Sequence, residues 1–92
     1  MRANAEAIKW SEPDVVDSLT DKVLTQGLSI KPLTGCDINY VNALDDVMVS
    51  DEYLELTNKW LKCELPCCYV RNKVNELLRA RVYDLIEGLK RG

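Results

Sequence analysis

Apolar side chains recur most regularly in the last third of the chain, where they predict a long amphipathic helix. Between Val70 and Leu89 they return every three or four residues, which is the period of one face of an α-helix. The stripe consists of Val70, Val74, Leu77, Leu78, Val82, Leu85, Ile86 and Leu89. Pro66 lies just before it and suits a first helical turn, where no backbone donor is needed. Such a helix measures about 30 Å, more than a small core needs, so we expect part of the stripe to remain for a partner.

Two shorter helices are predicted upstream of this stripe. The first is expected to begin at Gly35, because Thr34 and Asp37 have the form of a capping box with Asp in place of Glu. Its apolar face would consist of Ile38, Val41, Leu44 and Val47 or Met48. Ser50 is the predicted N-cap of the second, which runs to about Lys62. Its inward residues are expected to be Tyr53, Leu54, Leu56, Trp60 and Leu61.

The N-terminal third has a different period and predicts strands. Residues 7–10 and 24–31 alternate apolar with polar side chains, as a strand with one buried face does. Turn-forming residues lie between them, so we predict a β-hairpin over residues 6–31 that ends before Pro32. A helix over Pro13–Leu24, with Pro13 at its first position, is the competing interpretation.

These elements predict an α+β fold in which a small N-terminal β-hairpin precedes three helices over residues 34–92. A chain of 92 residues with 47% apolar and 29% charged side chains matches a single, mainly helical domain over residues 1–92. The longest uncharged stretch, from Val23 to Ile30, is far shorter than the roughly 20 apolar residues of a membrane span. The N-terminus also lacks the apolar segment of a secretory signal. We therefore expect a cytoplasmic protein that makes no membrane contact.

Charge is distributed unevenly along the chain. Residues 1–61 hold five basic and eleven acidic side chains, whereas residues 62–92 hold seven basic and four acidic ones. Such asymmetry suits oriented association with a charged partner or with a second copy, so a homo-oligomer held by opposite charges is one expectation. Two solvated faces are the simpler interpretation. A sequence pI near 4.9 disfavours nucleic acid as a ligand.

Catalytic chemistry has little support in the sequence. The chain has no histidine, the usual general base near neutral pH, and it has no glycine-rich phosphate loop. The carboxylate pairs Asp45-Asp46 and Asp51-Glu52 diverge on a helix surface, which favours helix-start and surface roles. We therefore predict a protein that is not an enzyme and needs no cofactor.

The four cysteines suggest a zinc site, but their spacing supplies only part of the ligand set that zinc requires. Cys63 and Cys67 have the separation of one ligand pair, but Cys36 stands alone and Cys68 diverges from its neighbour. With no histidine to replace a second pair, we predict no metal site and reduced cysteines that act as small buried hydrophobic residues near helix ends.

One segment resembles a known family. The chain reads AIKWSEP, then a turn, then LSIKPLTGCD from Leu28 to Asp37, followed by helices that change from acidic to basic. This order resembles the tail assembly chaperones of tailed bacteriophages, in which a strand ends in proline and a turn follows the pattern leucine-(arginine or lysine)-x-Pro-Thr-x-x-Asp. Here one residue is inserted between Pro32 and Thr34, and Asp17-Ser18 replaces the Asp-Gly turn of the family's first hairpin. The resemblance implies a non-catalytic assembly factor that coats the tape-measure protein and recruits tail-tube subunits, without cofactor or active site.

Two binding surfaces are predicted. For a chaperone that shields another chain's apolar helices, the partner-binding residues would lie on the last helix and are Tyr69, Val82, Leu85, Ile86 and Leu89. The alternative function is a small acidic regulatory or inhibitor protein that blocks a basic or nucleic-acid-binding groove of its partner. Its binding face would be formed by Asp45, Asp46, Asp51, Glu52 and Glu55.

Overall fold

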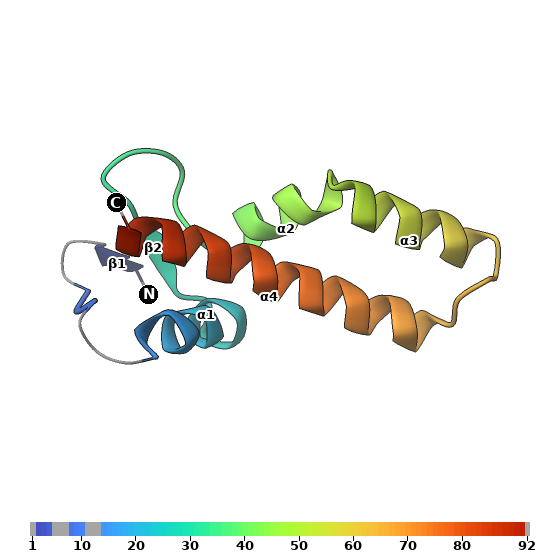
Figure 1. Cartoon of the computed structure of the whole chain (residues 1–92), viewed down its shortest axis with the longest axis horizontal. Helices are drawn as coiled ribbons and strands as arrows, with labels where there is room; N and C mark the ends of the chain where they lie inside the picture. Colours follow the sequence, from blue (N-terminus) through green and yellow to red (C-terminus); the bar gives the residue numbers. More distant parts are fainter. Residues whose placement is uncertain (1, 5–7, 11–13, 92) are drawn as a thin grey trace.

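The computed structural model describes residues 2–4, 8–10 and 14–91, within which the chain forms four helices and two very short strands (Figure 1). The elements in chain order are β1 Arg2–Asn4, α1 Val15–Gln26, β2 Ser29–Lys31, α2 Tyr40–Met48, α3 Asp51–Leu61 and α4 Cys67–Arg91. Both α1 and α2 pack against α4, which runs the length of the molecule. The fold is therefore mostly helical, and the predicted α+β class is wrong.

The predicted β-hairpin over residues 6–31 is absent from the described residues. Residues 8–10 form no strand, and β1 pairs with β2 in parallel, with Ala3 opposite Ile30. The competing helix is the one that forms, as α1, because Val16, Leu19 and Val23 recur at helical spacing and are all buried. Parallel strands need a long crossover between them, and α1 supplies it. Pro13 itself lies outside the described residues.

The position of the α1 C-terminus explains why the alternating pattern of residues 24–31 is not one strand. Gly27 adopts a left-handed backbone with φ of 70°, and the Leu28 amide donates to the Lys22 carbonyl at 3.2 Å. The helix therefore ends within the alternating segment, and only Ser29–Lys31 is a strand. Leu28 and Ile30 are buried beyond the turn.

Helix α2 begins at Tyr40 and not at the predicted Gly35. Ile38 is held in extended backbone, since its amide and carbonyl exchange 2.8 Å hydrogen bonds with those of Ile30. The helix can therefore start only after this bridge, where the Asn39 side chain accepts from the Asn42 amide at 2.9 Å. The long-range bridge prevails over the capping pattern at Thr34.

The two remaining helix predictions are confirmed. Ser50 caps α3 by accepting from the Tyr53 amide at 3.3 Å. Helix α4 starts directly after Pro66, and its 25 residues span about 37 Å at the usual helical rise. None of the described helices is long and apolar enough to cross a membrane.

The core lies at one end of the molecule. It is formed by α1, β2, α2 and the C-terminal half of α4, and α3 contributes no buried residue to it. Its buried apolar members are Val16, Leu19, Val23, Leu28, Ile30, Ile38, Ala43, Val47, Leu78, Val82 and Ile86. Thr20 is also buried, and its hydroxyl donates to the Val16 carbonyl at 2.7 Å.

The chain therefore has two regions. We call residues 51–76, which comprise α3, the following loop and the N-terminal part of α4, the arm; the other described residues form the body. Figure 1 shows the arm as a helical hairpin that extends beyond α1 and α2. It accounts for the elongated outline of 46 × 24 × 23 Å.

Candidate protein-binding site

The arm exposes large apolar side chains because α3, beyond its junction with α2, packs only against α4 among the described elements. The exposed fractions are 51% for Leu54, 46% for Trp60, 67% for Leu61 and 43% for Tyr69. Leu54 and Leu61 are seven residues apart and so share one face of α3. Grouped apolar exposure on a small protein marks an interaction surface, and Trp and Tyr are enriched where binding energy concentrates. The arm is therefore the best candidate for a protein-binding site in the described structure.

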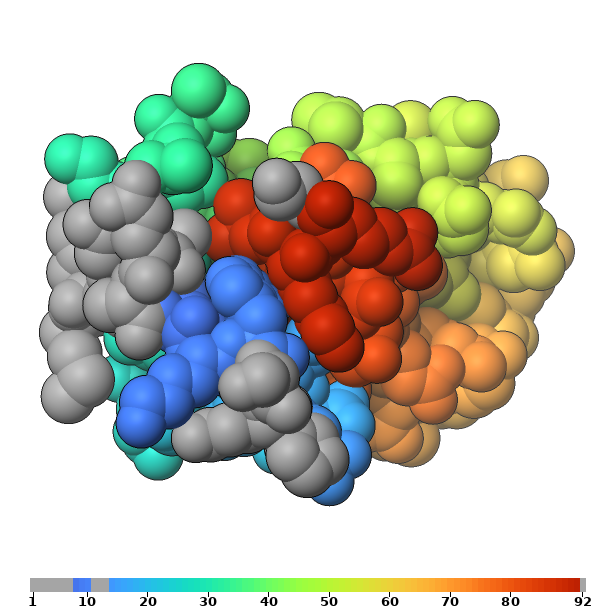
Figure 2. All heavy atoms as spheres, turned by 60° about the vertical axis from the view of Figure 1, so that its left-hand side comes forward, coloured from blue at the N-terminus to red at the C-terminus, as the bar shows by residue number. Residues whose placement is uncertain are grey.

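The predicted partner-binding residues on α4 fall mostly in the body. Val82 and Ile86 are fully buried, and Leu85 and Leu89 are half-buried against the core. Figure 2 shows the C-terminal part of α4, in red, beside N-terminal segments in blue. Val82 and Ile86 are therefore not accessible to a partner, whereas docking at Leu85 and Leu89 stays a prediction. Tyr69 alone lies on the arm and is exposed.

Sequence reasoning missed the α3 side of the arm. The sequence predicts that all five apolar residues of α3 face inward, yet Leu54, Trp60 and Leu61 are exposed. A signal was present, because apolar residues at 53, 54, 56, 60 and 61 cover more than one face of an eleven-residue helix. A helix with one neighbour buries one face, so the remainder stays exposed.

The five carboxylates of the predicted acidic face are all exposed and lie on α2 and α3 around the junction of these helices. Asp46 accepts from Arg81 of α4 at 3.1 Å, and Glu55 forms an ion pair with Lys59 at 3.1 Å. Within the described part of the chain, the remaining three carboxylates form no ion pair; they are Asp45, Asp51 and Glu52. The junction therefore keeps unpaired negative charge.

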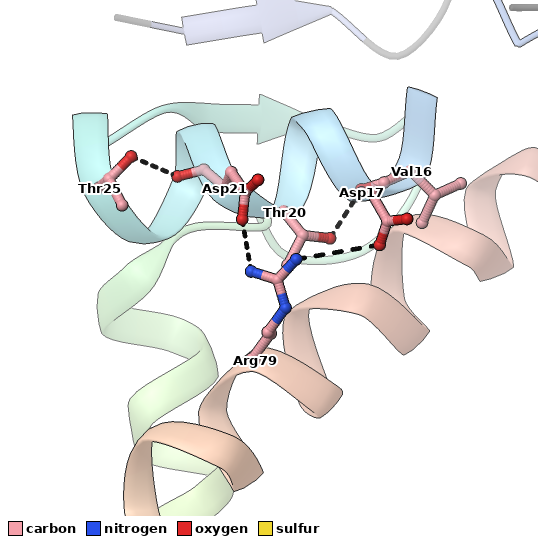
Figure 3. A network of polar contacts seen from close by, with 6 residues as sticks. All are labelled: Val16, Asp17, Thr20, Asp21, Thr25 and Arg79. Carbon is pink, nitrogen blue, oxygen red and sulfur yellow. Dashed lines mark hydrogen bonds and ion pairs between the residues drawn. The ribbon is translucent and has the colours of Figure 1, made fainter. Parts of the chain in front are cut away.

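Basic side chains of α4 also tie the body together. Arg79 donates to Asp21 and lies 3.9 Å from Asp17, so it links α4 to α1 (Figure 3). The hydrogen bond to Asp21 raises the pKa of the Arg79 guanidinium above its ordinary value, as do the nearby negative charges. Together with the Arg81–Asp46 contact, this link shows that part of the charge asymmetry in the sequence is neutralised within one chain.

The cysteines differ from their prediction in one respect. Cys36, Cys63, Cys67 and Cys68 are all exposed, and three of them lie at the tip of the arm, so they do not act as buried hydrophobic residues. Among the residues that the structure describes, no group of three or more His, Cys, Asp or Glu is placed to hold a metal ion.

Comparison of the chain with family models, curated proteins and solved structures finds no match. Function is therefore inferred from the arm and from its charge pattern.

Proposed function

We propose that the chain is a non-catalytic protein-binding assembly factor whose arm shields an apolar helix of a partner protein. The observation that carries the proposal is the exposure of Leu54, Trp60, Leu61 and Tyr69 on the arm, where, among the described elements, α3 and α4 pack only against each other. Exposed apolar side chains also occur in the body, Val41 and Val49 among them, but Val82 and Ile86 of its core are fully buried. An amphipathic helix that packs along α3 and α4 would cover Leu54 and Leu61, which share one face of α3, and complete a three-helix layer.

We further propose that the partner belongs to the class of tape-measure proteins, which makes the chain a tail assembly chaperone. The support is the resemblance over Leu28–Asp37, together with a β2 strand that ends at Lys31, directly before Pro32. A long coiled-coil protein presents repeated apolar stripes before it assembles, and such stripes match the exposed face of the arm. The hairpin that the resemblance implies does not form among the described residues, so the main support for this proposal is the arm and not the N-terminal region.

Co-expression with a tape-measure protein tests the proposal. The Leu54→Asp and Leu61→Asp double variant should co-purify at least about tenfold less partner, because a desolvated apolar contact is replaced by a buried charge. Leu33→Asp is the matched control, because Leu33 is 74% exposed but lies outside the arm. Undiminished binding by the double variant, or equal loss in the control, would contradict the proposal.

The acidic inhibitor is a second candidate, supported by the unpaired carboxylates Asp45, Asp51 and Glu52 at the junction. Binding to a basic groove would fall steeply with added salt and with Asp51→Asn and Glu52→Gln, and would tolerate Leu61→Asp. The opposite pattern of sensitivity favours the assembly factor.

A further inference from the structure

We propose that a second copy of this chain covers the arm, in an antiparallel dimer in which the tip of each arm contacts the α2–α3 junction of the other copy. This inference goes beyond partner binding, because it identifies what occupies the apolar surface when no partner is present.

The shape of the arm suits association with its own copy. In the described structure, α3 and the N-terminal part of α4 form a two-helix layer that nothing else covers. Two such layers packed face to face make a four-helix bundle, the usual arrangement for helices with one apolar side. A twofold axis lets Leu54 and Leu61, which share one exposed face of α3, face the same residues of the second copy, as in most homodimers.

Charge determines the direction of packing. Residues 45–55 at the junction carry five acidic side chains and no Lys or Arg, whereas residues 56–75 toward the tip carry four basic side chains and one acidic one. Lys59 and Lys73 already pair with Glu55 and Glu76 of their own chain. In the described part of the chain, Lys62 and Arg71 form no ion pair, and neither do the junction carboxylates Asp45, Asp51 and Glu52.

The opposite charges of one copy are too far apart to neutralise each other. Helix α3 has eleven residues and so separates its two ends by about 16 Å. The Debye length at physiological ionic strength is about 8 Å, so the attraction between tip and junction within one chain is largely screened. In an antiparallel dimer the tip of one copy lies beside the junction of the other, and these charges come into contact.

The parallel alternative is disfavoured by the same residues. Parallel packing would bring Lys62 and Arg71 of both copies together at one end and Asp51 and Glu52 of both copies at the other. Antiparallel packing replaces both repulsions with attractions. Because the axis is twofold, every contact occurs twice.

The dimer and a partner helix would use the same surface. Self-association therefore protects the arm at high protein concentration, and a partner must displace the second copy. This competition keeps the apolar side chains covered before assembly.

Charge reversal with rescue tests the proposal on the chain alone. One variant reverses the tip by Lys62→Glu and Arg71→Glu, a second reverses the junction by Asp45→Lys and Glu52→Lys, and a third combines all four changes. Sedimentation equilibrium at low salt measures the dimer dissociation constant, and circular dichroism confirms that each variant keeps its helices. Lys is compatible with position 45, near the C-terminal end of α2.

We expect a wild-type dimer that weakens with salt, and an at least about tenfold weaker dimer for each two-residue reversal. The four-residue variant should return to within about threefold of wild type, because each attraction is restored with its sign exchanged. A wild-type chain that stays monomeric throughout the concentration series, a tip reversal that strengthens association, or a folded four-residue variant without rescue would overturn the proposal. No partner is present in this experiment, so its failure is separate from failure of the assembly-factor proposal.

Discussion

The two halves of α4 have the same apolar period but differ in how far their apolar side chains are buried. In the body, α4 packs against both α1 and α2, and Leu78, Val82 and Ile86 are buried. In the arm it has only α3 beside it, so Val74 is half-buried and Tyr69 is exposed. The difference shows that a helical stripe sets which face is apolar, while the number of neighbouring elements sets how much of that face is buried.

Truncation of one side chain in each region should give the largest contrast. Ile86→Ala removes a fully buried side chain and should lower the free energy of unfolding by about 2–5 kcal/mol. Leu61→Ala on the exposed face of the arm should change it by less than about 0.5 kcal/mol. Urea unfolding monitored by circular dichroism measures both values. Equal losses at the two positions would show that the arm is packed as tightly as the body.

Removing a helix N-cap in each region compares the body with the arm through a smaller loss of stability. Asn39→Ala in the body and Ser50→Ala at the base of the arm each remove an N-cap side chain, a loss of about 1 kcal/mol. We expect the Asn39 variant to lower global stability, because α2 contributes Ala43 and Val47 to the core. The Ser50 variant should mainly speed hydrogen exchange of the α3 amides, because the arm opens locally.

Protection factors measured by NMR on the two cap variants distinguish these outcomes. If Ser50→Ala accelerated exchange throughout the body, the arm and the body would be one cooperative unit, and the division into two regions would be wrong.

An effect slightly smaller than that of the caps is expected at the tip of the arm. Cys63 has a left-handed backbone with φ of 60°, and the turn is closed by the Glu64 amide, which donates to the Lys59 carbonyl at 2.9 Å. Glycine adopts this backbone without the steric cost of a Cβ atom, so Cys63→Gly should stabilise the arm by about 0.5–1 kcal/mol. Slower amide exchange in α3 than in wild type is the expected result; faster exchange would contradict the assigned turn.

The sequence carried enough information for elements that depend on local chemistry. Ser50, followed by Asp51 and Glu52, marks the start of α3, and Pro66 marks the start of α4. The sequence carried less information for elements whose ends depend on contacts with a distant segment. The hydrogen bonds between Ile30 and Ile38 delay α2, and α1 ends in the middle of an alternating stretch that resembles one strand.

The sequence predicts that an apolar surface is left for a partner, but it does not predict where on the chain that surface lies. An apolar stripe longer than the core was evident from Val70–Leu89, but periodicity does not reveal which end α1 and α2 cover. The body covers Val82 and Ile86, so the exposed surface shifts to the other end of α4 and onto α3. Tertiary contacts between segments far apart in the chain determine which end of α4 is covered.

The two tryptophans, one in each region, allow the most direct test of an uncovered arm. Trp10 packs against the core of the body, whereas Trp60 is exposed on the arm. Trp10→Phe leaves Trp60 as the sole tryptophan, and Trp60→Phe leaves Trp10, so acrylamide quenching reports each region separately. In dilute protein we predict strong quenching of Trp60 and weak quenching of Trp10, with protection of Trp60 alone as the concentration rises. If Trp60 were as protected as Trp10 at the lowest concentration, the apolar surface of the arm would already be covered within one chain, and the account would be contradicted.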